Sequence, residues 1–220
     1  LYKSIGAELS EEKLNSWLGF SQDNGSWRTY RPNEVDPTIE EQSLDSKGWS
    51  STHNCVGAVA AHTLAKYFDE KTARTSIEYL LETQHADGSW SSYWWSSDIY
   101  ATSFAIQALC ESARNDEVTI ARIQRGCDWL VSKQETTGAW NDAFYTALAI
   151  NALMLNKEKY LAQIEQGIVW LVDNQLDDGS WITHPVLRIP HPEVLEPAEV
   201  AAWRTSPFGY NTLTYDNQRS

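Results

Sequence analysis

A short phrase recurs four times and constrains the fold more than any other feature of the sequence. In each copy an aromatic-Leu pair is followed by Gln, then Gly, then Trp, and the Gln always lies five residues after the first aromatic. Recurrence of this kind is the signature of a repeat architecture, so the sequence predicts a protein built from related helical units. The four copies are Trp17-Leu18…Gln22…Gly25-Ser26-Trp27, Tyr79-Leu80…Gln84…Gly88-Ser89-Trp90, Trp129-Leu130…Gln134…Gly138-Ala139-Trp140 and Trp170-Leu171…Gln175…Gly179-Ser180-Trp181.

Each phrase closes an amphipathic segment. Residues 127–131 and 168–172 place apolar side chains at helical spacing. The Gly that follows can take the left-handed conformation that ends a helix, and the Asp and Ser beside it favour a turn. We expect the Gln amide to satisfy free backbone groups at the helix end. The Trp should pack on the neighbouring repeat, so the phrase is interpreted first as a structural device.

After three of the phrases a second kind of helix begins, richer in Ala and apolar around more of its circumference. Residues 54–61, 99–109 and 143–153 have this character, which is typical of buried helices. The repeat therefore predicts a surface-side helix, a Gly turn with Trp, a buried helix and a short turn. The expected helices cover residues 10–21, 51–68, 72–84, 98–114, 117–133, 142–156 and 158–174.

With these features the sequence resembles the squalene/hopene cyclase and protein prenyltransferase superfamily, whose members carry Gln-x-x-x-Gly-x-Trp repeats on an α/α toroid. The resemblance covers about residues 10–185. Residues 88–103, Gly-Ser-Trp…Trp…Ile-Tyr-Ala-Thr-Ser, are similar to a region of class II terpene cyclases whose aromatic residues line a cavity for carbocations. The resemblance implies an all-α toroid, here incomplete because about seven helices are too few to close a ring.

The resemblance also implies a set of site residues. Class II cyclases protonate an alkene with the middle Asp of an Asp-x-Asp-Asp-Thr motif, and the nearest match is Asp98-Ile99-Tyr100-Ala101-Thr102. Tyr100 stands where the acid is expected, so Asp98 is the candidate acid and Tyr100 a cation stabiliser. Residues 34–38, which contain Asp36, are a weaker echo. The candidate substrate-binding residues are Trp94, Trp95, Phe104, Phe144, Tyr145 and His53.

Each candidate has a structural alternative. Asp98 could cap its helix, and Asp142 has the same two interpretations with capping favoured. The aromatic residues could be core, or a cavity wall whose ring faces stabilise positive charge. Tyr100 and Tyr145 each precede a Thr, so we expect them to project toward one central space. His53 could tune an Asp or merely cap a helix.

The chemistry leaves three classes of function open. The first is a terpene-cyclase-like enzyme that binds an apolar isoprenoid; it needs no cofactor and no metal. The second is a non-catalytic or partial toroid domain that binds an apolar ligand or a partner, with a second chain or missing domain completing the ring. A zinc prenyltransferase is disfavoured because Tyr100 replaces the expected Cys and no matching His is visible. The third class, a glycan-active toroid, lacks paired carboxylates at persuasive spacing.

Length, charge and cysteine content set further bounds. The 220 residues are enough for one domain, with interruptions at 28–50 and 182–210 that read as loops. The formal net charge of −13 argues against nucleic acid as a partner. Cys55, Cys110 and Cys127 have no metal-binding spacing, so we expect reduced core thiols in a cytoplasmic protein. A catalytic Cys55 beside His53 is the less favoured alternative. A fourth buried helix is expected to begin at residues 208–211.

Overall fold

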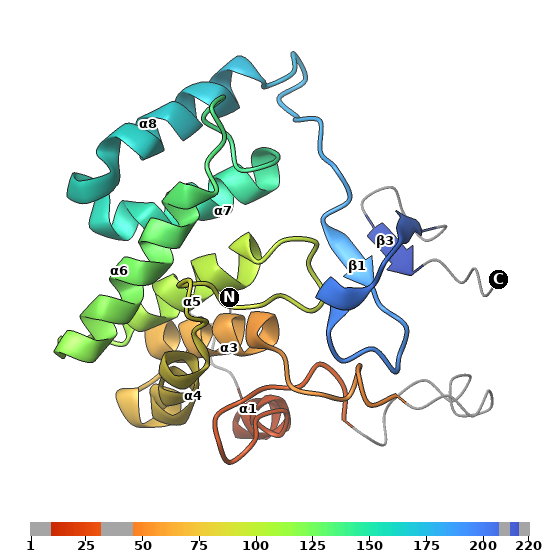
Figure 1. Ribbon diagram of the computed structural model, residues 1–220. Helices are drawn as coiled ribbons and strands as arrows, with labels where there is room; N and C mark the ends of the chain where they lie inside the picture. The colour runs from red at the N-terminus through yellow and green to blue at the C-terminus, as the bar shows by residue number, and fades with distance from the viewer. Residues whose placement is uncertain (1–9, 32–45, 207–211, 216–220) are drawn as a thin grey trace.

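The computed structural model describes residues 10–31, 46–206 and 212–215, which form an arc of alternating outer and inner helices (Figure 1). Helices α3, α5 and α7 pack in series as the inner layer, and α4, α6 and α8 follow as outer helices. The prediction of a mainly helical α/α-toroid fold is confirmed. The helices are α1 (Glu11–Leu18), α3 (Asn54–Tyr67), α4 (Glu70–Thr83), α5 (Ile99–Glu111), α6 (Glu117–Ser132), α7 (Ala143–Leu153) and α8 (Lys157–Asp173), with 3₁₀ turns η2 (Met154–Asn156) and η3 (Pro197–Glu199).

Short polar residues start the helices where the sequence places them. Asp69 accepts a hydrogen bond from Thr72 N at 2.8 Å, and Asp116 accepts one from Thr119 N at 2.9 Å. Such a carboxylate pairs a backbone N–H group that has no partner inside the helix and favours the positive end of the helix dipole. The caps therefore fix where each outer helix begins.

The glutamines of the repeated phrase tie one outer helix to the next. Gln84 Nε2 donates to the carbonyl of the Gly in its own turn at 2.9 Å and to Arg122 O of α6 at 2.8 Å. Gln134 repeats this pattern with its own Gly and with Gln163 O of α8, both at 2.9 Å. The amide thus bridges two repeats, and neither of its partners is a carbonyl at the end of its own helix, in contrast to the expectation from the sequence.

The glycines of the phrase let two backbones come together. Gly88 and Gly138 have φ of +102° and +93°, in turns that follow the ends of α4 and α6 rather than at the first position after each helix. A Cβ on Gly88 would overlap Arg125 O, and one on Gly138 would lie 2.7 Å from Gln166 O. Both the conformation and the close approach therefore require Gly.

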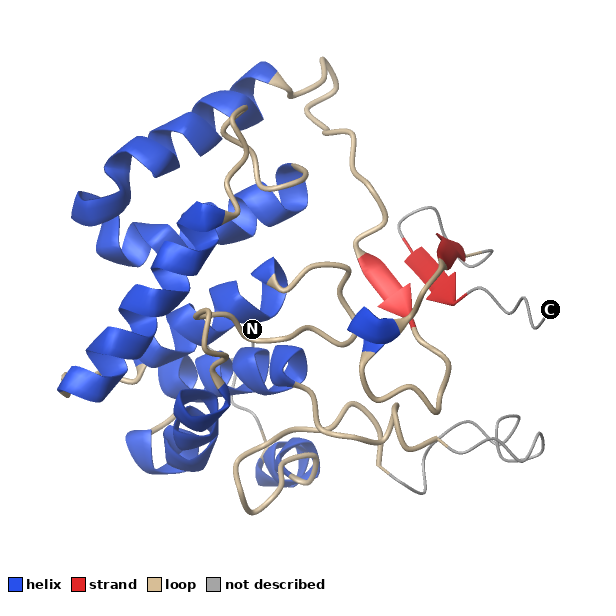
Figure 2. Ribbon diagram, viewed as in Figure 1, coloured by secondary structure: helices blue, strands red, loops and turns tan. Residues whose placement is uncertain are grey.

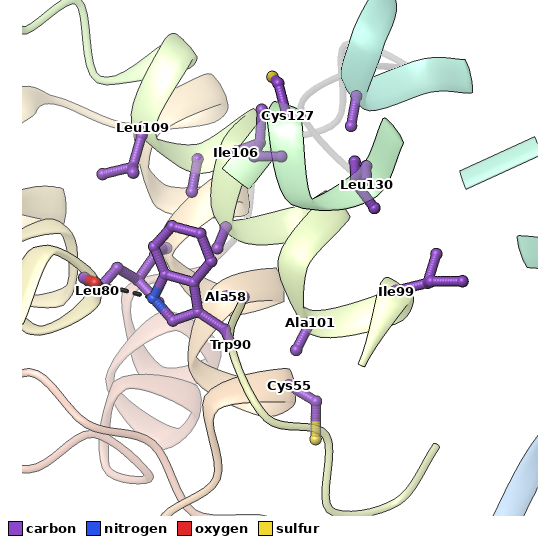
Figure 3. Packing of buried hydrophobic residues seen from close by; sticks show 14 of the residues in the cluster. Cys55, Ala58, Leu80, Trp90, Ile99, Ala101, Ile106, Leu109, Cys127 and Leu130 are labelled. Carbon is purple, nitrogen blue, oxygen red and sulfur yellow. Dashed lines mark hydrogen bonds between the residues drawn. The ribbon is translucent and has the colours of Figure 1, made fainter. Parts of the chain in front are cut away.

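The tryptophans fill the space that this approach leaves. Trp90 Nε1 donates to Leu80 O at 2.8 Å, and Trp140 makes the matching bond at 2.6 Å (Figure 3). Their rings lie against Gly126 and Gly167 of the next outer helix, where a Cβ would be only 3.2 and 3.0 Å from the ring. Both indoles are fully buried, which confirms the predicted packing on the neighbouring repeat. We call the Gln, Gly and Trp contacts together the repeat joint.

The first phrase makes a partial version of the repeat joint. Trp27 Nε1 donates to Ser76 Oγ of α4 at 2.8 Å, and Gly25 lies against the backbone of Thr75. Gln22 Nε2 donates instead to Ser21 O at 2.9 Å within its own turn. The contact point on the receiving helix is again a small residue, here Ser76.

Residues 182–210 were expected to be a loop, and this prediction was wrong in part. The segment carries β1 (Leu187–Ile189) and β2 (Trp203–Thr205), which pair with β3 (Thr212–Tyr215) in the order β1-β3-β2 (Figure 2). β1 runs parallel to β3, and β2 runs antiparallel to it. The expected start of a fourth buried helix at 208–211 lies largely outside the described residues, and residues 212–215 are a strand.

Residues 185–194, which we call the strap, return across the N-terminal ends of the inner helices. Val186 O accepts a hydrogen bond from Ser96 N at 2.8 Å, and Arg188 N donates to Trp94 O at 2.8 Å. Farther along, Pro190 O accepts a bond from Trp49 Nε1 at 3.0 Å. The strap thus extends the loop between α4 and α5 as an added strand and covers one end of the arc.

The remaining sequence expectations have simple outcomes. Cys55 and Cys127 are buried, Cys110 is half-buried, and none of the three forms a disulfide. Within the described residues, no helix combines the length and hydrophobicity that a membrane span requires. The weak acidic echo at residues 34–38, Asp36 included, lies outside the described residues.

Candidate functional site

An apolar pocket of about 390 Å³ opens between the first turn and the start of α5. Trp95 and Tyr100 line it from one side, and the side chains of α1, its turn and α3 line the other. Arg28 and Thr29 are the polar residues at this pocket. The apolar contributors are Trp17, Phe20, Trp27, Cys55, Val56, Val59, Ala60, Trp95 and Tyr100.

Four of the predicted aromatic residues form one stack beside this pocket. The ring of Trp95 lies 3.8 Å from that of Tyr100 at 10° and 5.3 Å from that of Phe144 at 16°. Phe104 lies one helical turn beyond Tyr100, with centroids 4.9 Å apart. All four side chains are half-buried, so each keeps part of its surface open. Burial raises the pKa of Tyr100 to about 12, so its phenol is neutral near pH 7.

Trp94 belongs to a second aromatic cluster. Its Nε1 donates to Thr29 Oγ1 at 2.7 Å, and its ring meets Tyr93 at 4.8 Å and Trp49 at 5.9 Å. Two tryptophans adjacent in sequence therefore face different surroundings, because successive residues of an extended segment point to opposite sides. Trp94 is outside the lining of the apolar pocket.

Tyr145 does not share the space of Tyr100. It is fully buried, and its hydroxyl hydrogen-bonds Ser96 Oγ at 2.8 Å and donates to Val186 O of the strap at 3.1 Å. The helix starts align through their threonines: Thr102 Oγ1 accepts from Trp90 N, and Thr146 Oγ1 accepts from Trp140 N.

This alignment makes Phe144, not Tyr145, the counterpart of Tyr100, since each lies two residues before its Thr. The sequence held that signal, because the number of residues to the Thr differs between the two tyrosines. The expected common projection of the two tyrosines is therefore not observed.

Asp98 lies at the start of α5 but does not cap it. Its carboxylate accepts a hydrogen bond from Ser92 N at 2.7 Å, while Ser97 Oγ accepts from Ile99 N at 3.2 Å. Burial raises the pKa of Asp98, and the Ser92 hydrogen bond and the charge of Arg188 act in the opposite direction. Asp98 lines a polar pocket with Arg188 and Lys133 rather than the apolar pocket.

Asp142 does cap its helix, as the sequence favoured. Its carboxylate accepts a bond from Tyr145 N at 3.0 Å and a longer one from His184 N at 3.4 Å. Asp142 is 1% exposed, and these hydrogen bonds offset the free-energy cost of burying its carboxylate.

His53 is a buried neutral residue at the start of α3. Its ring stacks on Tyr93 at 3.8 Å, and Nε2 lies 3.0 Å from Gly48 O. Burial lowers its pKa to about 4. Cys55 is also buried, its Sγ accepts from Tyr93 N at 3.4 Å, and burial raises its pKa, which leaves it a poor nucleophile.

Sequence reasoning missed three contributors. Trp17 and Phe20, in the first phrase, line the apolar pocket, although they were read as parts of the repeat. Arg188, in the segment expected to be a loop, is half-buried and donates from its guanidinium to Tyr93 O at 2.9 Å and to Ser92 O. A larger pocket of about 500 Å³ lies at the opposite end of α5, but its charged lining suits an apolar ligand poorly.

Comparison with known families decides the relationship. The squalene-hopene cyclase C-terminal domain matches residues 10–145 of the chain. The chain belongs to this family. Among curated members, the alpha-onocerin synthase LCD of Lycopodium clavatum is 32% identical over 162 residues, which are 64% of this chain and 21% of that protein. The squalene–hopene cyclase of Bradyrhizobium diazoefficiens is 27% identical over 152 residues, 62% of this chain and 22% of that enzyme.

Solved structures share the fold. The type II terpene cyclase MstE from Scytonema superposes with a TM-score of 0.83 at 24% identity, over 96% of this chain and 65% of that one. A variant of MstE in complex with its product, merosterolic acid A, gives 0.82 at 25% identity, over 98% and 64%. The chain spans about a fifth of those two curated relatives and about two thirds of MstE.

Proposed function

We propose that this chain forms part of a class II terpene-cyclase-type site and binds an apolar isoprenoid against its aromatic stack. The supporting observation is the apolar pocket beside Trp95 and Tyr100, in a chain of the squalene-hopene cyclase family. A concave, mainly apolar site with few polar groups is the usual form of a small-molecule site. A variant of the structural neighbour MstE holds geranylgeranyl dihydroxybenzoate as substrate, which favours a ligand of this chemical class.

The aromatic stack would stabilise positive charge that develops on the substrate. A cation beside an aromatic ring face is stabilised by about 0.5–2 kcal/mol per contact, more as water is excluded. Tyr100, Phe104 and Phe144 offer three half-open rings along two neighbouring inner helices. A polyene lying along them would meet ring faces at successive carbons, and no cofactor is needed for this role.

Asp98 is the proposed acid. A neutral carboxyl would transfer its proton to one alkene carbon, which leaves a carboxylate on the protein and a carbocation on the substrate. Burial of Asp98 and its raised pKa favour the proton-bearing form that this step needs. Tyr100 would then stabilise the cation without itself ionising. Trp94, Trp95, Phe144, Tyr145 and His53 would support the site by direct contact or by packing.

The alternative is a ligand-binding domain without catalysis. One observation favours it: Asp98 lines the polar pocket with Arg188, whereas Tyr100 lines the apolar one. The acid and the aromatic stack therefore face different spaces in this structure. A second chain or a further domain would then have to complete the site, in line with the small share of the curated relatives that the chain spans.

Binding and turnover can be separated with squalene as the probe. Native mass spectrometry of the full chain should show a squalene adduct that Tyr100→Ala and Phe144→Ala reduce by about tenfold in affinity. Val118→Ala, at an exposed site on α6, is the control and should bind as the parent does. No adduct at any squalene concentration, or equal adducts in all variants, would contradict the proposed site.

The catalytic part rests on Asp98→Asn. Loss of cyclised product with the squalene adduct and helical content retained would support protonation by Asp98. Product formation at the parental rate in Asp98→Asn would rule this acid out. An adduct without product in the parent chain would favour the binding domain.

A further inference from the structure

The apolar pocket has a polar rim, Arg28 and Thr29, supplied by the turn that follows α1. Figure 1 shows α1 and this turn below α3. Among the described residues, Arg28 is the only charged side chain that lines the pocket. Backbone hydrogen bonds fix the rim on both sides: Arg28 N donates to Phe20 O at 3.1 Å, and His53 N donates to Trp27 O at 3.0 Å. The rim is therefore held in place before any ligand arrives.

The guanidinium of Arg28 lacks an acceptor. Its Nε is buried and makes no hydrogen bond, and the described part of the chain provides neither a hydrogen bond nor an ion pair to the rest of this side chain. A guanidinium keeps its positive charge in proteins, and a buried donor without an acceptor is destabilising. An anion that entered the pocket would supply the missing acceptor.

The groups beside Arg28 add donors and positive charge. Trp94 Nε1 donates to Thr29 Oγ1 at 2.7 Å, so the hydroxyl proton of Thr29 can be donated to another acceptor. The guanidinium of Arg31 lies 4.5 Å from the ring centroid of Phe20, which itself lines the pocket. Within the described residues, no Asp or Glu lines this pocket. The rim is therefore suited to a negatively charged group.

The cations at the other pockets already have partners. Arg188 donates to two backbone carbonyls and shares its polar pocket with the carboxylate of Asp98. At the pocket of about 500 Å³, Arg114 lies 3.8 Å from a carboxylate oxygen of Glu78, and three glutamates line the space. Of these three arginines, Arg28 is the one whose charge is not balanced by the residues that the structure describes.

We propose that the ligand of the apolar pocket carries a carboxylate beside its isoprenoid chain, and that Arg28 binds this carboxylate. The inference rests on the proposed function, since the chain of the ligand would lie against the same aromatic stack. A planar guanidinium can pair with both oxygens of a carboxylate through two parallel N–H donors, and Nε is one of its donors. One guanidinium balances one negative charge, so a carboxylate fits the rim better than the more highly charged diphosphate.

Farnesoic acid and farnesol are matched probes, because they share one isoprenoid chain and differ in the head group. Equilibrium dialysis of the full chain at about pH 8, with each probe below the concentration at which it aggregates, gives both dissociation constants. The parent chain should bind the acid at least about tenfold more tightly than the alcohol. Arg28→Met should weaken binding of the acid by about tenfold and change binding of the alcohol by less than about twofold.

Arg74→Met is the matched control, because Arg74 is an exposed residue of α4 at the 500 Å³ pocket. This variant should keep the preference for the acid. Circular dichroism must show that each variant retains its helical content. Should Arg28→Met lose it, Arg28→Gln, which keeps a polar end but no charge, is measured against the same criteria.

Several results would overturn the proposal. Equal affinities of the parent chain for acid and alcohol would exclude a carboxylate-binding rim. A preference that persists in the folded Arg28 variant, or that disappears in Arg74→Met, would place the anion elsewhere. Tighter binding of farnesyl diphosphate than of farnesoic acid would overturn the choice of a carboxylate.

Failure of this inference can be distinguished from failure of the proposed function. If neither farnesyl probe binds while the squalene adduct is observed, the carboxylate-binding rim is excluded and the isoprenoid site stands. If squalene also fails to bind, the proposed function fails together with the inference that rests on it.

Discussion

The interior repeats and the last repeat carry the same Gln, Gly and Trp residues but make different contacts with the rest of the molecule. Gln134 donates to Gln163 O of α8, and Trp140 packs against Gly167 of α8. Among the described residues, Gln175 donates only to Gly179 O of its own turn, and Trp181 donates to Leu171 O of the helix that precedes it. The phrase by itself therefore specifies the turn and the hydrogen bonds that its Gln and Trp donate within the repeat. Burial, and most of the stabilisation that follows from it, depends on the helix that comes next.

The largest difference is expected at the tryptophans. Trp140→Ala removes a fully buried indole and should lower the free energy of unfolding by about 3–5 kcal/mol. Trp181→Ala removes a half-buried indole that no helix of the described residues covers, and should cost about 1 kcal/mol. Urea unfolding followed by circular dichroism measures both, and equal losses would break the comparison.

Acid should weaken the first repeats before it affects α8. Burial lowers the pKa of His53 from 6.5 to about 4, so between these values the unfolded chain binds a proton that the folded chain does not. Stability should thus fall as pH drops from 6.5 to 4, by up to about 3 kcal/mol. The cause is that Nδ1 is buried without a partner among the described residues.

Hydrogen exchange at pH 6.5 and 4.5 checks this expectation. Protection of α3 and α5 should decrease at the lower pH, after correction for intrinsic exchange rates, while that of α8 changes least. His53→Gln should remove most of the slope; His62 contributes less, although burial lowers its pKa as well. A slope unchanged in His53→Gln would show that other groups set the acid sensitivity.

The glycines give a smaller contrast. Gly138→Ala combines a left-handed backbone with a clash against Gln166 O and should cost about 2–3 kcal/mol. Gly179→Ala has the same backbone strain but open space, so about 1 kcal/mol is expected. Thermal unfolding of the two variants tests this, and a larger loss of stability at Gly179 would contradict the open space beside that residue.

The smallest contrast is at the glutamines. Gln134→Ala removes two hydrogen bonds, to carbonyls in two different repeats, and should cost about 1–2 kcal/mol. Gln175→Ala removes one bond at an exposed turn, where water can replace it, for about 0.5 kcal/mol or less.

Periodicity located the helices because their signal is local. The expected helix at 117–133 and the observed α6, Glu117–Ser132, differ by one residue, and Asp116 marks its start. The three strands went unpredicted because each has only three or four residues, and β1 and β3 pair across more than twenty positions of the chain. A run that short has no measurable alternation, and its prolines suggested a loop.

The site was predicted by residue type better than by position. Trp95, Tyr100 and Phe144 do come together, since apolar faces of neighbouring inner helices must meet. Asp98 faces the other way because Ser92 N binds its carboxylate, a contact that depends on how the preceding loop folds. No one-dimensional pattern encodes that choice.

The strap has a consequence for how the chain acquires its structure. Helical repeats form from contacts between near neighbours, whereas the bond from Trp49 to Pro190 joins residues 141 positions apart. Closing a loop of that length has a larger entropic cost than any repeat-to-repeat contact. The arc can therefore assemble first, and the strap can dock onto it last. The end of the apolar pocket nearest α5 would then be the last of the described parts of the molecule to become ordered during folding.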